Sequence, residues 1–565
     1  MRLSSTPVLL LICTLYAHFS LAHEKHRTCR NVPGNAGYPK AAAWKKLNVT
    51  IGGRLVQAVP TAKYCASLPG GTCTDAQWTS ALFRSINPGS MIDGYDLKPP
   101  SLCLRNATTC GQGNVPIFSV EAQSAADIQA TVRFAGYNNL RLVVKSSGHD
   151  VLGRSTAPYS LLIRTAGLQN ISMTDGFFVG TQNTGPAVTI GSGVHTQTLY
   201  QVMKANGKSV VVPTAATVCP AGGYVQGAGH SALSPLFGLA ADNVLEFHIV
   251  VASGELLQVN SISHPDLFYA LRGGGAGSWG VIVSATFRTF PAFDETLGVI
   301  EIAASSNAAM GALATVHAQH IFDLEPVRAG QYFYVFAATP NVTSLTLQLL
   351  THIPNTTAAQ AAALLAPFRN AALALPDVSL LAEEYTVQNV NDALFLADDG
   401  AGNNMVVGSR LIPVSVLRDS PDTVGRVYEQ LLNAGALECN LNDPTGQVAA
   451  NANIRSAVHP AWRTAKTHLL TGSFWTDQTP LAEIDVLRKK FQTTQLPIME
   501  QLSGKHGAAY SNEADVNEPH FQTTFFGPNY TKLTGIKAKY DPHDLFIVAA
   551  GVGSERWDEW GLCTV

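Results

Sequence analysis

The loop SSGHDVLGRS (146–155) follows LRLVVK (140–145), a short apolar run typical of a buried strand. His149 stands directly after Gly148, a residue that lets the backbone come close to a planar ligand. The other polar side chains of the loop offer hydrogen-bond donors suited to phosphate oxygens, and these are Ser146, Ser147, Arg154 and Ser155. A neutral imidazole is a nucleophile that attaches to electrophilic cofactors, or a general base. The alternative is a hydrogen-bonded structural histidine.

The segments around this loop alternate between strand-like and helix-like patterns. VPIFSV (115–120) is strand-like, and QSAADIQATVRFAG (123–136) predicts a helix because Ser124 and Asp127 have capping-box spacing. Together with LRLVVK they form a βαβ-like unit. The same reasoning predicts a helix at 194–207 and strands at 160–165, 187–191 and 208–213. The pattern predicts a mixed α+β fold.

Two glycine clusters follow in the same region. The first contains Gly222, Gly223, Gly227 and Gly229, and the second runs from Gly273 to Gly280. Successive N–H groups in glycine-rich turns form anion-binding nests that suit a pyrophosphate. Tight turns between strands are the alternative for either cluster alone. Neither cluster contains the Gly-Lys-Ser/Thr of a Walker loop, and GAGSWG (275–280) fits a bare G-x-G-x-x-G pattern only weakly.

The composition of the whole chain sets broad limits. Of its 565 residues 46% are hydrophobic and 14% charged, and the formal net charge is −3. The length suggests more than one domain, and the absence of a basic surplus gives no reason to expect nucleic acid or a membrane surface as a partner. Residues 1–22 combine Arg2, an apolar stretch and small residues before His23, which predicts a cleaved signal peptide. A membrane anchor is the alternative, but the apolar stretch is short for a bilayer.

Further features agree with a secretory route. N-x-S/T sequons begin at Asn48, Asn106, Asn170, Asn341, Asn355 and Asn529. Eight cysteines remain after residue 22, and the pairs Cys65/Cys73 and Cys103/Cys110 are close enough to form local disulfides. No cysteine spacing suggests a zinc site, so we expect no metal. We expect a secreted protein or one in an endomembrane lumen, the vacuole included.

Four ordered motifs together resemble one protein family. They are SSGHDVLGRS, TVCPAGGYVQGAGHSALSPLFGLAADNVLEF (217–247), DLFYALRGGGAGSWGVIVSATFRTFP (266–291) and KAKYDPHDLF (537–546). They resemble the vanillyl-alcohol-oxidase flavoproteins, in particular the secreted, fungal berberine-bridge-enzyme-like and isoamyl-alcohol-oxidase-like FAD-linked oxidases. The middle of the chain, 296–500, matches the family only in its general mixture of strand-like and helix-like segments.

The resemblance implies an α+β fold with a defined domain order. After a Cys/Gly/Pro-rich N-terminal region (23–114), an FAD-binding domain of the p-cresol-methylhydroxylase (PCMH) type, built from two subdomains, would span 115–294. An α+β substrate-capping domain would span 295–509, and a berberine-bridge-like segment (510–565) would return to the FAD domain. We expect a monomer.

The resemblance also implies site residues. His149 would carry FAD covalently, and Asn512 would lie near the flavin. Tyrosines or carboxylates of the capping domain or tail are candidate proton acceptors; we favour Tyr510, with a buried core tyrosine as the alternative. The glycines of the first cluster, His230 and Asp242 would help to bind the cofactor, and a structural histidine is the alternative for His230. A second, cysteinyl link occurs in some relatives; an ungapped match puts Ala215 at that cysteine's position, whereas a gapped match would use Cys219. We favour a single link.

The implied activity is hydride transfer from a small alcohol or a secondary-metabolite intermediate to FAD, and then to O2 with release of H2O2. A carbohydrate oxidase and a flavin-dependent cyclase are alternatives within enzymes. A flavin-bearing protein without turnover is the alternative from another class. The sequence does not identify the substrate, because specificity in such folds depends on the capping domain.

Overall fold

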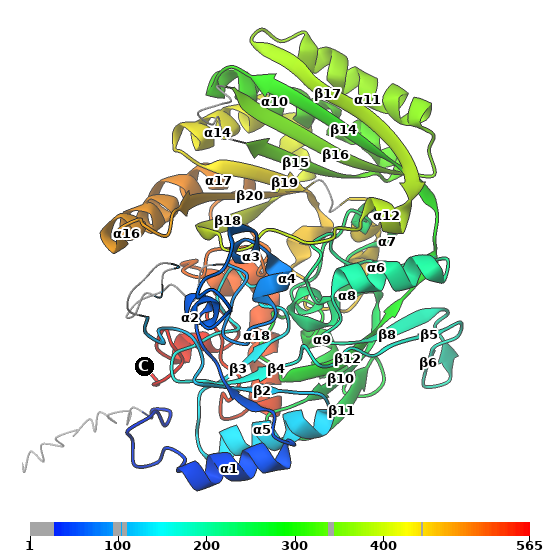
Figure 1. Cartoon of the computed structure of the whole chain (residues 1–565). Coiled ribbons are helices and arrows are strands. Elements are labelled where there is room, and N and C mark those ends of the chain that lie inside the picture. The colour runs from blue at the N-terminus through cyan, green and yellow to red at the C-terminus, as the bar shows by residue number, and fades with distance from the viewer. Residues whose placement is uncertain (1–27, 94–102, 104, 106–109, 337–343, 442–444) are drawn as a thin grey trace, which may run out of the picture.

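The computed structural model describes residues 28–93, 103, 105, 110–336, 344–441 and 445–565, with side chains omitted for 437–441 (Figure 1). The predicted signal peptide and the sequons at Asn106 and Asn341 lie outside the described residues. Within the described ranges, no helix combines the length and apolar character needed to cross a membrane.

The first sheet confirms the predicted strand–helix–strand unit but inserts another strand into it. Strands β1 (Leu55–Gln57), β2 (Phe118–Glu121), β4 (Leu161–Arg164) and β3 (Leu142–Lys145) lie in that order, and β4 pairs in parallel with both β2 and β3. Helix α5 (Ala125–Tyr137) begins at the Ser124–Asp127 capping box and buries Ile128, Val132 and Ala135. Crossover connections between parallel strands place such a helix against one face of the sheet.

The N-terminal region is more regular than its composition predicts. Helix α1 (Ala41–Thr50) lies along α5, where the Trp44 ring is 4.9 Å from that of Phe134 and 4.8 Å from that of Phe118. Strand β1 extends the first sheet through antiparallel pairing with β2. The sequence of this region lacks long periodicity, and tertiary contacts with the first sheet and α5 supply the stabilisation that local patterns do not.

The second sheet is antiparallel. Its order is β11 (Leu256–Asn260), β10 (Val244–Val250), β12 (Val281–Arg288), β8 (Ala187–Gly191) and β5 (Ile171–Thr174), with helices α6 (Thr196–Ala205) and α9 (Pro265–Ala270) beside it. The strand predicted at 208–213 is short: only β9 (Lys208–Ser209) pairs, with β13 (Phe290–Pro291). Val210, Val211 and Val212 instead pack into the core, so burial rather than pairing explains their apolar run.

The third sheet has seven antiparallel strands and carries helices on one face (Figure 1). Its order is β17 (Val378–Asn389), β14 (Asp294–Ala304), β16 (Leu345–Pro354), β15 (Gly330–Phe336), β19 (Leu437–Leu441), β20 (Ala465–Trp475) and β18 (Asn404–Pro413). The covering helices are α10 (Asn307–His320), α11 (Ala358–Leu373), α14 (Pro421–Asn433) and α17 (Leu496–Ser503).

Alternation along β15 shows which way this sheet faces. Phe333 packs under the helices, 5.6 Å from the ring of Tyr428, whereas Tyr332 joins the core of the second sheet. Because successive side chains of a strand point to opposite faces, Tyr334 lies on the same face as Tyr332. The helix-free face of the large sheet therefore closes over the other two sheets.

The C-terminal segment packs on the domain built from the first two sheets. Lys537 of α18 (Tyr530–Tyr540) donates to the backbone oxygen of Ser278 at 2.8 Å, and Leu545 and Phe546 join the core around α5. A disulfide between Cys29 and Cys563 ties the two ends of the described chain together.

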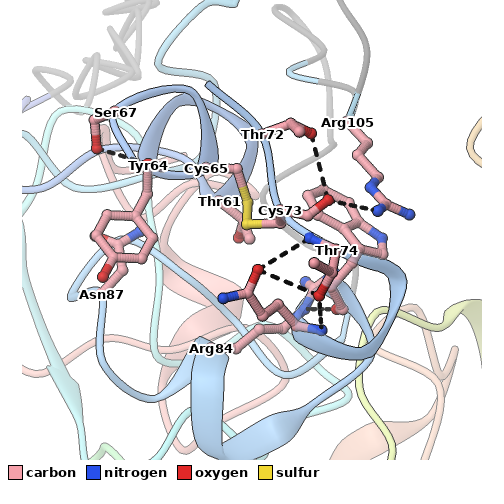
Figure 2. Close-up of a disulfide and its surroundings, with 12 residues drawn as sticks. Thr61, Tyr64, Cys65, Ser67, Thr72, Cys73, Thr74, Arg84, Asn87 and Arg105 are labelled. Carbon is pink, nitrogen blue, oxygen red and sulfur yellow. Dashed lines mark hydrogen bonds between the residues drawn. A yellow bond between two sulfur atoms is a disulfide. The ribbon is translucent and has the colours of Figure 1, made fainter. Parts of the chain in front are cut away.

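Both predicted local disulfides are present. Cys65–Cys73 connects α2 (Thr61–Ala66) with the turn before α3 (Asp75–Trp78), where Arg105 donates to the Cys73 oxygen at 2.7 Å (Figure 2). Cys103 pairs with Cys110. Among the cysteines with described side chains, Cys219 is the free one, and it is buried.

The described sequons differ in how available their amides are. Asn170 and Asn355 are exposed and Asn48 is partly buried. The amide of Asn529 is already occupied, because its Nδ2 donates to the oxygens of Ala457 and Val458 and its Oδ1 accepts from Tyr269. A glycan on Asn529 would disrupt these bonds, so this sequon is a poor glycosylation site.

Candidate flavin and substrate site

A cavity of about 370 Å³ lies between the loops of the first two sheets and the helix-free face of the large sheet. Most of the predicted site residues line it, namely Ser146, Ser147, Gly148, His149, Arg154, Ser155, Cys219, Gly222, Gly223, His230, Tyr510 and Asn512. The loop SSGHDVLGRS and the first glycine cluster, which are separate in sequence, therefore meet at one cavity.

Three of the predicted cofactor-binding residues do not line the cavity, namely Gly227, Gly229 and Asp242. Asp242 binds Arg463 through both carboxylate oxygens, at 2.7 and 2.8 Å, and caps the Leu239 N–H. At Gly227 an added Cβ would lie 2.4 Å from Nδ2 of Asn512. Gly229 has φ +72°, and a Cβ there would lie 2.7 Å from the Tyr224 ring. The structure gives these residues roles in packing and ion pairing, and does not bring them to the cavity surface.

His149 is fixed by two residues far away in sequence. Its Nε2 lies 2.7 Å from Oδ2 of Asp399 and 2.6 Å from Oγ1 of Thr217. The backbone N–H of Thr217 donates to the other oxygen of Asp399 at 3.0 Å. A carboxylate partner favours the tautomer that carries its proton on Nε2, and we assign this tautomer. Nδ1 then keeps its lone pair.

Arg154 is held rigidly at the cavity wall. Its Nε donates to Asp150 at 2.9 Å and its Nη2 donates to Oδ1 of Asn512 at 3.0 Å, and the residue is only 9% exposed. Asn512 in turn donates from Nδ2 to the Tyr510 hydroxyl oxygen at 2.8 Å. The chain of bonds links the SSGHDVLGRS loop directly to the YSNE segment (510–513).

The cavity wall also contains a buried hydrogen-bond acceptor without a partner. The Gln226 side chain is 5% exposed and donates from Nε2 to the Gly222 oxygen at 3.0 Å, but its Oε1 has no hydrogen-bond partner. A buried polar atom without a partner is costly, which suits a bound group that presents a donor. With the hydroxyls and guanidinium of the 146–155 loop as phosphate donors, this lining fits a flavin dinucleotide.

Cys219 is a poor second attachment point. Burial raises the pKa of its thiol to about 12, although a hydrogen bond with Ser147 opposes the shift. A thiol reacts as the thiolate, so a protonated Cys219 is weakly nucleophilic. Ala215, the residue that the ungapped match places at the cysteine position, also lines the cavity.

A cluster of ionisable side chains occupies another part of the cavity. Oε1 of Glu513 lies 3.1 Å from Nε2 of His230, and its Oε2 lies 3.6 Å from Nδ1 of His468 on β20. The ring of Tyr510 is 5.1 Å from that of His230 and 5.7 Å from that of His468. Trp462 packs against the same rings, at 6.2 Å from His230 and 5.8 Å from His468.

One ligand atom from each of His230, His468 and Glu513 lies within 4.8 Å of the others, which is close enough to share a metal ion. A metal on the two nitrogens that face Glu513 would leave the remaining proton of each ring on its far nitrogen. Those atoms, Nδ1 of His230 and Nε2 of His468, are buried and have no partner. Metal-bound histidines normally donate that proton to an acceptor. A hydrogen-bonded acid–base cluster is therefore the better interpretation.

Sequence reasoning missed five residues of this site: Asp399, His468, Tyr332, Tyr334 and Glu513. Glu513 follows Asn512 directly, and its charge was the available signal. Tyr332 and Tyr334 stack at 5.9 Å on the cavity face of β15. They and His468 come from the large sheet, whose sequence shows no local motif.

The fold and the site define a VAO-type, PCMH-like FAD-binding protein. The FAD binding domain family model matches residues 116–260, and the berberine and berberine-like model matches 509–553. Two VAO-type flavoproteins of Myceliophthora thermophila C1 superimpose with TM-scores of 0.87 and 0.83 at 26% and 28% identity, covering 95% of this chain and 100% of each of theirs. Berberine bridge enzyme shares the fold, with a TM-score of 0.63 at 17% identity.

Curated relatives align over nearly the whole chain. An uncharacterized FAD-linked oxidoreductase of Arthroderma benhamiae is 35% identical, and the FAD-linked oxidoreductase patO of Aspergillus clavatus is 32% identical, each over 95% of both chains. The chain belongs to the berberine-bridge-enzyme-like family of FAD-linked oxidoreductases. FAD is its cofactor, and the predicted fold class is confirmed.

Proposed function

We propose that this FAD-linked oxidoreductase is a secreted, monomeric oxidase that acts on a small alcohol or a secondary-metabolite intermediate. The observation that carries the proposal is the shared cavity: the flavin-binding loops, an acid–base cluster and a pair of stacked tyrosines all line it. When bound, FAD would supply the two-electron acceptor for the hydride of the donor, with O2 as the final oxidant and H2O2 as its product.

Residues that line the cavity would hold the cofactor and position the donor for this reaction. His149 would attach to the cofactor through Nδ1, because Asp399 keeps the proton on Nε2. Arg154 and the serines of its loop would bind phosphate oxygens. Tyr332 and Tyr334 offer a stacked aromatic surface for the donor on the opposite side of the cavity. Holding the donor between these groups and the flavin is the positioning that hydride transfer requires.

The three disulfides support secretion, because disulfides persist mainly in oxidising compartments. The cleaved leader and the glycans stay predictions, and N-terminal sequencing with glycosidase treatment of the secreted protein tests both.

A substrate screen under anaerobic conditions tests the activity. We expect the yellow purified protein to bleach with one class among alcohols, sugars and natural-product intermediates, and to regain its colour in air while H2O2 forms. A sugar as the donor would select the carbohydrate-oxidase alternative. A rearranged product formed without O2 and without net oxidation would select a cyclase. Colour that no donor changes would favour a flavoprotein without turnover.

A further inference from the structure

The carboxylate of Glu513 is held between two imidazoles and opens onto the cavity. It lies 3.1 Å from Nε2 of His230 and 3.6 Å from Nδ1 of His468, and 35% of its side chain is exposed. His468 is only 2% exposed, so the carboxylate is the member of the cluster that a donor can reach most directly. Binding FAD gives no reason for a carboxylate between two histidines at this position.

We propose that Glu513 accepts the hydroxyl proton of the donor, that His230 and His468 position it, and that Tyr510 donates a hydrogen bond to the donor oxygen. This assignment rests on the proposed oxidase function. It gives the role of proton acceptor, which the sequence had suggested for Tyr510, to a neighbouring residue.

Tyr510 is unsuited to accept the proton. Burial and the negative charge of Glu513 raise its pKa above the ordinary value, although a hydrogen bond with Asn512 opposes the shift. A phenol in this environment stays protonated. Its oxygen already accepts from Nδ2 of Asn512 at 2.8 Å, so its O–H is directed elsewhere as a donor.

Glu513 has the opposite character. Burial would raise its pKa, but the interactions with His230 and then His468 outweigh burial, and the pKa lies below its ordinary value. The group is therefore a carboxylate at neutral pH. Burial lowers the pKa of His468 to about 4, so this imidazole is neutral and is able to share the proton after transfer.

The reaction balances with these groups. As the C–H hydride leaves the donor carbon for the flavin, the O–H bond breaks toward the Glu513 carboxylate and the C–O bond becomes a carbonyl. A hydroxyl becomes strongly acidic as its carbon loses hydride, so a carboxylate suffices as acceptor. The donor loses two electrons, O2 receives them through the flavin, and H2O2 carries the two hydrogens away.

A test that needs no substrate uses histidine-labelled holoprotein and NMR. Glu513→Gln should shift the resonances of His230 and His468, and His468 should stay neutral to about pH 5 in the wild type. Glu383→Gln, a carboxylate whose Oε1 accepts from the Tyr385 hydroxyl at 2.8 Å on the distant strand β17, is the matched control and should leave both resonances unchanged. Unchanged His230 and His468 resonances in Glu513→Gln would contradict the proposal that Glu513 interacts with both imidazoles.

Kinetics test the assigned roles with the donor found in the screen. Glu513→Gln should slow anaerobic bleaching by about 10²–10⁴-fold, Glu513→Asp should recover part of the rate, and reoxidation of dithionite-reduced protein by O2 should not change. The fall of the wild-type rate toward acid pH should disappear in Glu513→Gln. Tyr224 and Tyr510 also interact with Glu513, but the pKa values of both phenols are raised, so neither titrates at acid pH.

The outcomes separate the two proposals. A wild type that bleaches with a donor while Glu513→Gln bleaches equally fast contradicts the role of Glu513 and leaves the oxidase intact. A larger loss of bleaching rate in Tyr510→Phe than in Glu513→Gln would return the acceptor role to Tyr510. A wild type that no donor bleaches contradicts the oxidase, and the NMR experiment still decides whether the cluster exists.

Discussion

Oδ2 of Asp399 lies 2.7 Å from Nε2 of His149, and so a carboxylate from the loop between α12 (Val390–Ala393) and β18 is paired with the histidine of the first motif loop. The two residues are far apart in the sequence, and Thr217 from a third segment contacts both. The orientation of the imidazole therefore depends on contacts between segments that are far apart in the sequence.

The first prediction concerns this pair. Asp399→Asn should slow covalent flavin attachment roughly tenfold or more, because the imidazole loses the carboxylate that fixes its tautomer and orientation. The measurement is the fraction of flavin that stays with the protein after acid precipitation during a time course of reconstitution. Asp392→Asn, which removes a surface partner of Lys204, is the control. Attachment at the wild-type rate in Asp399→Asn would contradict the role of Asp399.

The second prediction distinguishes one covalent link from two. His149→Ala should release its flavin completely in acid, whereas Cys219→Ser should retain it, since the pKa of this thiol is raised to about 12 and little thiolate forms. Mass spectrometry of flavin-labelled peptides reads the attachment site. A flavin peptide that contains Cys219 would show that the gapped match, with two links, is correct.

The third prediction is a pH dependence of stability. Burial lowers the pKa of His317 to about 4 from an ordinary value of 6.5. Below pH 6.5 the unfolded chain therefore binds a proton that the folded protein excludes, and stability falls as the pH falls toward 4. His317 should account for about 2 kcal/mol of the loss between about pH 7 and about pH 5.

His317→Gln should make that loss smaller, as measured by the change in Tm between the two pH values. The glutamine is able to replace the hydrogen bond that Nε2 of His317 makes with Oε1 of Gln331 at 2.7 Å. His248→Gln, at a histidine with a 40% exposed side chain, serves as the comparison. An equal pH effect on Tm in His317→Gln and wild type would contradict the prediction.

The fourth prediction concerns the disulfide between the termini. Replacing Cys29 and Cys563 with serine should cost about 2–5 kcal/mol of unfolding free energy, because the bond closes a loop across a sequence separation of 534. Thermal unfolding with and without reductant measures the effect. The pair Cys65/Cys73, with a separation of 8, should cost less when replaced in the same way. A larger loss for the short loop would show that local packing outweighs loop closure here.

Local sequence was sufficient to predict the parts of the fold that depend on neighbouring residues. The capping box at Ser124 and Asp127 begins α5 as expected, and strands β4 and β8 form within the predicted ranges 160–165 and 187–191. These features form from interactions a few residues apart. By contrast, the insertion of β4 between β2 and β3 and the docking of α1 on α5 depend on contacts that no local pattern records.

The sequence by itself determined the cofactor, because contiguous motifs such as SSGHDVLGRS carry the resemblance to an FAD-linked family. Only the tertiary structure decided which side chains complete the site. It excluded Asp242, whose carboxylate binds Arg463, and it brought Asp399 to His149 and His468 to Glu513. The physical reason is that these pairs form where separate domains pack together. The distances within these pairs are set by how the sheets pack across the cavity. The spacing of the residues along the chain does not encode that packing.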